Sequence, residues 1–167
     1  MVKIKKGNLL KANEDIIVHQ VNVQGIMGGG VARQLATLYP GLEKEYSEFC
    51  KRNKNEYQLL KGQICIVKVK DYKLIANIFS QDENFNTDYI MFRHCLRELV
   101  YIAKEFNLKI AMPYGIGCGI ANGDWNIVRK IIIEESRRSK ITLYKLEDKR
   151  CKRVEVLKNK LKKLLNM

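Results

Sequence analysis

Two glycine clusters in this chain lie where a strand should give way to a helix, an arrangement that leaves backbone N–H groups open to an anion. Gly28, Gly29 and Gly30 follow an apolar stretch at 16–21, and the segment PYGIGCGIANG at 113–123 follows another at 109–112. Glycine has no Cβ, so the backbone can turn sharply there, and the N-terminus of the following helix adds partial positive charge. Two such loops predict a ligand with two phosphates, such as a nucleotide diphosphate.

Neither cluster matches the common nucleotide-binding motifs. The dinucleotide fingerprint needs glycines at its first, third and sixth positions. Counted from Gly115 the sixth residue is Ile120, and counted from Gly117 it is Asn122. A P-loop would close with Gly-Lys-Ser/Thr, and neither segment has that lysine. Taken singly, each loop could also be no more than a tight turn between two elements.

A histidine and an aspartate stand next to these loops and could carry out chemistry. His19 lies near the end of the predicted strand, three residues before Asn22, and a histidine can change its charge near neutral pH. It could attack phosphorus as a nucleophile or act as a general acid and base; the alternative is a hydrogen-bonded histidine that only shapes the turn. Asp124 begins a helix directly after the second loop. It could orient water or His19, or simply stabilise the helix N-terminus.

Metal and cofactor chemistry has no basis in the residue pattern. The two histidines, His19 and His94, lie far apart in the chain, and the five cysteines form no CxxC pair. Neither a zinc site nor a disulfide framework is therefore predicted, and we expect no metal and no cofactor. The N-terminal stretch has no signal-peptide core, and no run approaches the ~20 apolar residues of a membrane span. Reduced thiols, a cytoplasmic location and no membrane contact are expected.

The elements that must hold these residues alternate between strand and helix. Strands are predicted at 2–5, 16–21, 64–70, 74–79, 109–112 and 141–146, and helices at 31–38, 42–52, 88–106 and from Asn122 or Asp124 to about 136. Thr87 is the expected N-cap of the long helix. The apolar face of that helix should carry Ile90, Leu96, Leu99, Ile102 and Phe106. This order predicts one α/β domain with a mostly parallel sheet between helical layers.

The chain is strongly basic, and part of its charge lies at the C-terminal end. The net charge is +13, and residues 145–167, with nine Lys and Arg against three Asp and Glu, hold +6 of it. A basic surface suits polyanions such as nucleic acid, although a cationic protein without such a partner is equally consistent. Apolar residues recur at helical spacing after 153, which predicts a basic amphipathic helix over 147–167. That helix could pack on its own domain, self-associate or contact nucleic acid.

Four segments together resemble one known family. They are KGNLL at 6–10, VHQVNVQGIMGGGVA at 18–32, MPYGIGCGIANGDW at 112–125 and ITLYKLE at 141–147. The chain resembles the macro domain family, the ADP-ribose-binding fold, over residues 1–146. The first glycine segment, with EKEY at 43–46, looks most like the subgroup that removes the phosphate from ADP-ribose 1″-phosphate. The resemblance implies a three-layer α/β/α fold whose mixed, mostly parallel sheet holds ADP-ribose, or a phosphorylated or conjugated derivative, at its strand ends.

The resemblance also implies which residues contact the ligand. Asn8, with Leu9 beside it, falls where many members have an aspartate that bonds the adenine amino group. Asn22, preceded by Gln20 and Val21, falls on the asparagine that contacts the distal ribose. Tyr144 lies where an aromatic near adenine is common, although it could be an ordinary strand residue. The other expected contacts follow the two loops: Gly28, Gly29, Gly30 and Val31 at the distal ribose and phosphate, and Pro113, Gly115, Ile116, Gly117, Cys118, Gly119 and Ile120 around the diphosphate.

The resemblance implies hydrolysis of ADP-ribose 1″-phosphate to ADP-ribose and phosphate and favours a catalytic role for His19. We expect Asp124, from its position after the second loop, to be the second catalytic residue. The main rival is removal of ADP-ribose from protein or nucleic acid. One related subgroup does this with a lysine after the central strand and an aspartate just after the glycine loop. Here IANIFSQ at 75–81 has no lysine, and Ala121 takes the position of that aspartate. These departures leave a water-mediated reaction open, and a non-catalytic ADP-ribose reader is the third interpretation.

Overall fold

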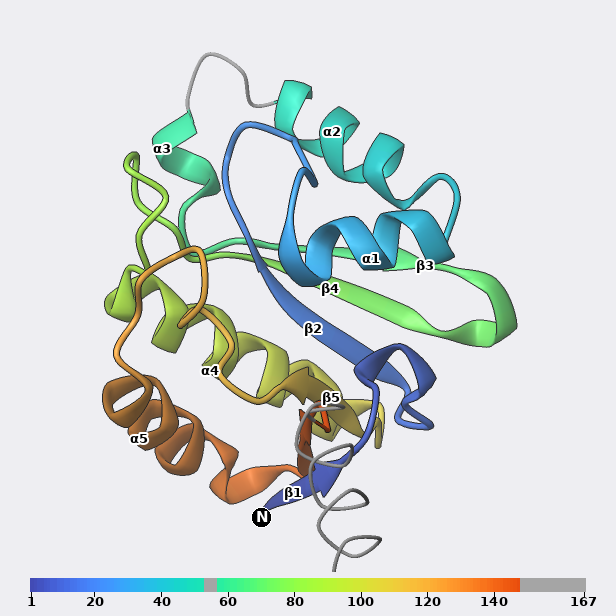
Figure 1. Ribbon diagram of the computed structural model, residues 1–167, viewed down its shortest axis with the longest axis vertical. Helices are drawn as coiled ribbons and strands as arrows, with labels where there is room; N and C mark the ends of the chain where they lie inside the picture. The colour runs from blue at the N-terminus through green and yellow to red at the C-terminus, as the bar shows by residue number, and fades with distance from the viewer. Residues whose placement is uncertain (53–56, 148–167) are drawn as a thin grey trace, which may run out of the picture.

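A mixed sheet forms the middle layer of the part of the chain that the computed structural model describes, residues 1–52 and 57–147 (Figure 1). Its strands are β1 (Val2–Lys6), β2 (Ile16–Val21), β3 (Ile64–Lys68), β4 (Leu74–Phe79), β5 (Ile110–Pro113) and β6 (Ile141–Lys145). They lie in the order β1-β6-β5-β2-β4-β3, and only β3 and β4 pair antiparallel. The expected basic helix falls, from residue 148 onward, outside the described residues.

Helices cover both faces of this sheet. α1 (Gly30–Leu38), α2 (Leu42–Arg52) and the single turn α3 (Tyr57–Leu60) lie on one face, and α4 (Tyr89–Glu105) and α5 (Trp125–Glu135) on the other (Figure 1). Short 3-10 segments occur at Leu9–Lys11, Lys70–Tyr72 and Ser136–Arg138. The predicted three-layer α/β/α architecture with a mostly parallel sheet is confirmed. α3 was not predicted, since one turn is too short to show a helical period.

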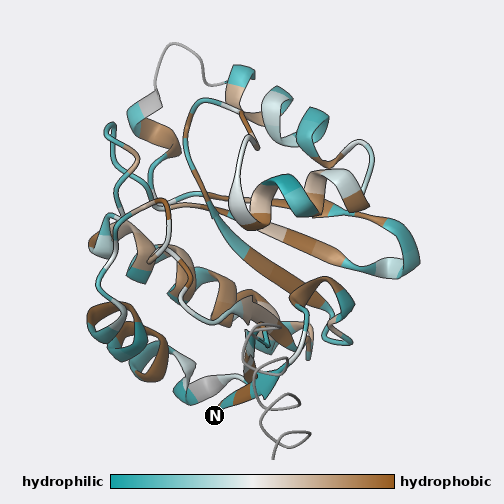
Figure 2. Ribbon diagram, in the orientation of Figure 1, coloured by the Kyte–Doolittle hydropathy of each residue, from teal (hydrophilic) through white to brown (hydrophobic). Residues whose placement is uncertain are grey.

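Two apolar cores, one on each face, fix β2 in the centre of the molecule. Ile16 and Val18 pack in the core under α4 and α5, whereas Ile17 and Val21 pack in the core under α1 and α2. A strand covered on both faces needs apolar residues at successive positions, which is why 16–21 shows little alternation. Figure 2 shows β2 changing from hydrophobic along its first half to more hydrophilic toward its carboxyl end. The polar residues therefore gather where the strand ends.

Helix α4 corrects two sequence predictions. Its N-cap is Asp88 rather than Thr87, because the Asp88 carboxylate accepts hydrogen bonds from the N–H groups of Ile90 and Met91. The predicted apolar face holds for the buried Leu96 and Leu99 but is wrong for Ile90 and Phe106, which are 75% and 72% exposed. Phe106 is the C-cap that follows the helix, and Ile90 lies beside the row of buried residues on the helix surface rather than in it. That stripe consists of Phe92, Cys95, Leu96, Leu99, Val100 and Ala103.

The connections after β2 and β5 create a crevice between them. The two strands are parallel neighbours, yet the chain leaves β2 toward α1 on one face and leaves β5 toward α5 on the other. Where adjacent parallel strands send their connections to opposite faces, the loops separate and leave a crevice at the carboxyl ends of the strands. Both glycine clusters lie in these two loops, so the topology places them on either side of one crevice.

Membrane spans and metal clusters are not features of the described part of the chain. Between residues 1–52 and 57–147, no helix combines the length and apolar character needed to cross a bilayer. The same residues contain no group of three or more His, Cys, Asp or Glu side chains placed to hold a metal ion.

Candidate functional site

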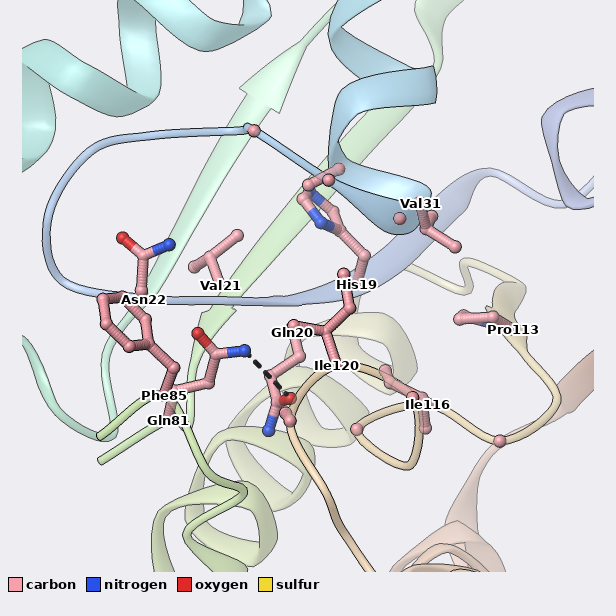
Figure 3. A pocket seen from close by; sticks show the side chains of 18 of the residues that line it. His19, Gln20, Val21, Asn22, Val31, Gln81, Phe85, Pro113, Ile116 and Ile120 are labelled. Atoms are coloured by element: carbon pink, nitrogen blue, oxygen red, sulfur yellow. Dashed lines mark hydrogen bonds between the residues drawn. The ribbon is translucent and has the colours of Figure 1, made fainter. Parts of the chain in front are cut away.

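A cavity of about 370 Å³ lies at the carboxyl ends of β2 and β5 (Figure 3). Three segments far apart in the sequence line it: β2 with the loop that leads to α1, the loop that follows β4, and β5 with the loop that leads to α5. The lining residues are His19, Gln20, Val21, Asn22, Ile26, Gly28, Gly29, Gly30, Val31, Ala32, Gln81, Phe85, Pro113, Tyr114, Gly115, Ile116, Gly117, Gly119, Ile120 and Ala121.

The first glycine loop presents an uncapped helix N-terminus to this cavity. Gly29 is the N-cap of α1, and it offers no side-chain hydrogen bond to the first turn. The N–H groups of Gly30 and Val31 consequently make no hydrogen bond within the described residues. Such N–H groups, together with the helix dipole, favour an anionic group of a ligand. The loop is anchored before the glycines by the Met27 N–H, which donates to the Glu43 carboxylate at 2.9 Å.

The second glycine loop needs glycine for close packing as well as for its backbone angles. Gly117 has φ +74°, and a Cβ there would lie 2.8 Å from the Thr87 hydroxyl oxygen. That hydroxyl donates a hydrogen bond of 2.7 Å to the Gly117 carbonyl oxygen. A Cβ on Gly123 would lie 2.6 Å from the same carbonyl oxygen. The loop therefore folds back on itself against Thr87, and the N–H groups of Gly117, Gly119 and Ile120 make no hydrogen bond within the described residues.

The two loops meet across the cavity. A Cβ on Gly29 would lie 3.1 Å from Cδ1 of Ile120, and one on Gly30 would lie 3.8 Å from the same atom. Ile120 is nevertheless 74% exposed, so its side chain stands at the mouth of the cavity rather than in a core. The structure thus brings both predicted anion-binding loops to one site, as a diphosphate ligand would require.

His19 lies on the face of β2 that packs against α1 and is only 1% exposed. Its Nε2 lies 2.7 Å from Oδ1 of Asn77, while Nδ2 of Asn77 donates to the Cys65 carbonyl oxygen at 2.9 Å. A carbonyl oxygen can only accept, so Asn77 must turn Oδ1 toward His19, and Nε2 must carry the ring proton. Nδ1 is therefore an unprotonated acceptor, and no described residue is its partner.

The charge state of His19 follows from its burial. Removal from water disfavours the imidazolium and lowers the pKa of His19 to about 4, although the hydrogen bond to Asn77 opposes this shift. The ring is therefore neutral at neutral pH and offers a lone pair at Nδ1. In that state it can act as a nucleophile or accept a proton, but it has no second proton to donate. Its predicted catalytic role stays a prediction.

The structure does not bring Asp124 to the cavity. It is the N-cap of α5, and its Oδ1 accepts a hydrogen bond of 2.7 Å from the Asn126 N–H. Its own N–H donates to the Tyr89 hydroxyl at 2.8 Å. Asp124 is exposed and is not among the lining residues. The geometry fits the structural alternative, helix capping, and gives Asp124 no contact with His19.

Four of the predicted ligand contacts also lie outside the cavity lining. The Asn8 side chain accepts from the Leu10 N–H at 2.9 Å and caps a 3-10 turn, while Leu9 is buried in the core under α1 and α2. The Tyr144 hydroxyl donates to Glu14 at 2.8 Å. Cys118 packs against the core under α4 and α5. The remaining predicted contacts all line the cavity: Gln20, Val21, Asn22, Gly28, Gly29, Gly30, Val31, Pro113, Gly115, Ile116, Gly117, Gly119 and Ile120.

Sequence reasoning missed the lining residues of the loop after β4. Gln81 and Phe85 reach the cavity because β2 pairs with β4, which puts the ends of both strands at the same edge of the sheet. Gln81 lies within 3.5 Å of Gln20 Oε1 (Figure 3). The polar run that follows the apolar strand at 74–79 was the signal available in the sequence. The other lining residues not predicted are Ile26, Ala32, Tyr114 and Ala121.

Comparisons with known proteins give one family and two named activities. The macro domain family model matches residues 18–132. An ADP-ribose 1″-phosphate phosphatase of Lodderomyces elongisporus is 31% identical over 94 residues, which are 54% of this chain and 56% of that protein. A DNA ADP-ribosyl glycohydrolase of Mycobacterium bovis is 26% identical over 138 residues, 80% of this chain and 38% of that protein. The matches thus span about half or less of these relatives.

One solved structure resembles the described fold along nearly its whole length. The macrodomain of Mycobacterium tuberculosis DarG has a TM-score of 0.76 to this chain at 23% identity. The match covers 89% of this chain and 99% of that one. At this level of identity the likeness concerns the fold alone.

Proposed function

This chain belongs to the macro domain family, and on that basis we propose that it binds ADP-ribose and hydrolyses ADP-ribose 1″-phosphate to ADP-ribose and phosphate. The observation that carries the proposal is the single cavity bordered by both glycine loops, in which Gly29 and Ile120 approach each other from opposite sides. The similarity to an ADP-ribose 1″-phosphate phosphatase over 94 residues supports the choice of substrate.

Backbone donors account for the binding part of this proposal. Each hydrogen bond from an N–H group to a charged phosphate oxygen contributes roughly 1.5–3 kcal/mol. A few such bonds from the two loops, together with burial of the adenine, would give micromolar affinity, or about −8 kcal/mol, after the cost of association. Of the described residues, none is needed as a metal ligand in this scheme, since the donors are part of the main chain.

We assign the chemistry to Nδ1 of His19. With Nε2–H held by Asn77, the lone pair of Nδ1 either attacks phosphorus or takes a proton from the attacking water. In the first route an N–P bond forms as the bond from phosphorus to the 1″ oxygen breaks, that oxygen takes a proton from solvent water, and a second water then splits the N–P bond to release phosphate. In the second route the oxygen of the attacking water bonds to phosphorus as the bond to the 1″ oxygen breaks, and the proton taken up by Nδ1 passes to that 1″ oxygen. Nδ1 is covered by protein atoms, so either route requires the neighbouring loop to move when the ligand enters.

A phosphate-release assay with two His19 variants tests this function. His19→Gln keeps an amide N–H for the bond to Asn77 but has no basic nitrogen, and His19→Ala removes both. Both variants should release phosphate from ADP-ribose 1″-phosphate ~10²–10⁴-fold more slowly than the wild type, the usual contribution of a positioned acid–base group. Calorimetry with ADP-ribose should show that both still bind. Equal rates in all three proteins would remove His19 from the mechanism, and binding without turnover in the wild type would leave a reader.

Asp124→Ala should separate capping from catalysis. Loss of the N-cap of α5 should lower the free energy of unfolding by about 1 kcal/mol, because the Asn126 N–H loses its partner. Phosphate release should stay within about twofold of the wild-type rate once the protein is folded. Chemical denaturation and the phosphate assay measure the two effects. A large fall in turnover without a fall in stability would restore the catalytic role that the sequence predicts.

Removal of ADP-ribose from a larger molecule is the second candidate function. The similarity to a DNA ADP-ribosyl glycohydrolase over 80% of this chain favours it. The lysine-dependent form of this reaction is not supported by the residues at the two expected positions. In the loop after β4, the residue that lies beside Gln20 is Gln81 rather than a lysine, and the residue after the second glycine loop is Ala121 rather than an aspartate. A water-mediated reaction would still release ADP-ribose from thymidine, guanosine or glutamate adducts. Each adduct should be assayed separately beside ADP-ribose 1″-phosphate.

A further inference from the structure

Gln20 is the polar residue that connects the walls of the cavity to one another. It is half-buried near the end of β2, on the same face of the strand as Ile16 and Val18. Its Nε2 donates to the Ser80 carbonyl oxygen at 2.9 Å, and it lies 3.1 Å from the Ser80 hydroxyl and 3.2 Å from the Thr87 hydroxyl. A carbonyl oxygen only accepts, which fixes the orientation of the amide. Both protons of Nε2 therefore face acceptors of the protein, and neither is left for a ligand.

The Thr87 hydroxyl carries this connection on to the second glycine loop. It is buried and has one proton, which it donates to the Gly117 carbonyl oxygen at 2.7 Å, whereas Oε1 of Gln20 lies 3.4 Å away. Its oxygen is then the acceptor for Nε2 of Gln20. The Thr87 N–H donates to the Ala121 carbonyl oxygen at 2.8 Å. Thr87 thus holds the loop at two points, and Gln20 fixes the direction in which the hydroxyl donates.

The Gln20 amide also packs directly against the turn of this loop. A Cβ on Gly117 would lie 3.3 Å from Oε1 of Gln20 and 3.4 Å from its Nε2. On its other side, Oε1 faces Nε2 of Gln81 at 3.5 Å (Figure 3). The Ser80 carbonyl is itself fixed by the Asp88 N–H at 2.9 Å, at the start of α4. Gln20 consequently ties a glycine loop that has few other supports to the ends of β2 and β4.

We propose that Gln20 is a positioning residue for the diphosphate, which holds the second glycine loop through Thr87 so that the free N–H groups of the loop converge on the cavity. The inference rests on the proposed function, because those N–H groups are the donors assigned there to the ligand. Gln20 lies on the face of β2 opposite His19 and makes no bond to that ring. It therefore acts on ligand binding rather than on the phosphate-release step.

Calorimetry and steady-state kinetics with Gln20→Met test this role. Methionine has a similar length and no charge, but it has no N–H to donate. The Kd for ADP-ribose and the KM for ADP-ribose 1″-phosphate should both rise about tenfold, while kcat should stay within about threefold. Gln63→Met is the matched control. Gln63 is exposed and outside the cavity lining, and its amide donates to the Leu59 carbonyl oxygen, so neither constant should change.

Variants of Thr87 show whether Gln20 acts through it. Thr87→Val keeps the shape of the side chain but lacks the hydroxyl, and it should raise the Kd for ADP-ribose about tenfold. Because both substitutions break one series of hydrogen bonds, the double variant should bind within about twofold of Thr87→Val alone. Thr87→Ser retains the hydroxyl and should restore the affinity to within about threefold of the wild type. Urea denaturation reports the stability of each variant beside its affinity.

Four results would contradict this role. Losses that multiply in the double variant would show that Gln20 and Thr87 act separately. Unchanged affinity in Gln20→Met would remove Gln20 from ligand binding, and a fall in kcat at constant KM would place it in the chemical step. If Gln20→Met did not fold, equal affinities of Thr87→Val and Thr87→Ser would still refute the connection.

NMR of the ligand-free protein separates this inference from the proposed function. The amide signals of Gly117 and Gly119 should shift in Gln20→Met, whereas those of Gly28 and Gly29 should not, because only the second loop bonds to Thr87. This result is expected whether or not the protein binds ADP-ribose. A wild-type protein that failed to bind ADP-ribose would overturn the proposed function, and unmoved signals of Gly117 and Gly119 would overturn the positioning role of Gln20.

Discussion

Gly117→Ala is expected to weaken binding of ADP-ribose at least tenfold and to lower the free energy of unfolding by about 2 kcal/mol. A Cβ at this position meets the Thr87 hydroxyl oxygen at 2.8 Å, and φ +74° is strained for alanine. To relieve both, the loop must give up its 2.7 Å bond to Thr87 and move its free N–H groups away from the cavity. Calorimetry and urea denaturation measure the two effects.

Gly119→Ala is the matched control for that substitution. Gly119 lies in the same loop and lines the same cavity, but a Cβ there has no heavy atom within 4 Å, and its φ is outside the left-handed region. Stability should be unchanged, and the affinity for ADP-ribose should stay within about threefold. If the two alanines acted alike, the effect would come from any added carbon in the loop rather than from the contact with Thr87.

Acid should destabilise the protein through His19 by up to about 3 kcal/mol. Burial holds the pKa of His19 at about 4, against about 6.5 in an unfolded chain. Between these values the unfolded chain binds a proton that the folded protein does not bind. The contribution of the neutral, buried His19 to the free energy of unfolding is therefore fully present above pH 6.5 and is lost as the pH falls toward 4. Urea denaturation at pH 7.5 and at pH 4.5 measures the difference.

The variant His19→Gln isolates this contribution, because it has no group that titrates at position 19. Its stability should fall much less than that of the wild type between the two pH values. A hydrogen bond from Arg97 holds the pKa of Glu135 below its usual range, although burial opposes this. Protonation of Glu135 therefore destabilises the folded protein mainly below pH 4.5, outside the range compared. Parallel falls in wild type and variant would show that the buried imidazole is not the source.

The sequence predicts those parts of the site that depend on local signals. The apolar run at 16–21 and the glycines that follow give a buried strand and an anion-binding turn, because both are properties of neighbouring residues. The second loop follows by the same argument. That the loops meet at Ile120 and Gly29 depends on β2 and β5 becoming parallel neighbours. The resemblance to a family implied one ligand site for both loops, whereas neither it nor composition and periodicity predicted which strands are neighbours.

Three predicted site residues lie outside the cavity lining for a common physical reason. The side chains of Tyr144 and Asn8 find partners in Glu14 and in the Leu10 N–H, and Asp124 finds one in the N-terminus of its own helix. Each of these side chains therefore has its hydrogen-bond partner away from the cavity. Phe85 was missed for the opposite reason. A single aromatic in a polar loop has no periodic signal, and only the pairing of β2 with β4 brings it to the site.

The polar row formed by His19, Asn77 and Cys65 also selects how the sheet is assembled. Asn77 bonds a main-chain oxygen of β3, which is an edge strand held by a single neighbour. If β3 slid by one residue, that oxygen would turn away, and the buried Asn77 amide would lose a partner at a cost of about 1–3 kcal/mol. The mispaired sheet would also bury the wrong side chains. Asn77, which holds the ring of the residue assigned to hydrolysis, therefore also discriminates against misregistered strand pairing during folding, so substitutions at Asn77 would impair the yield of native protein together with its activity.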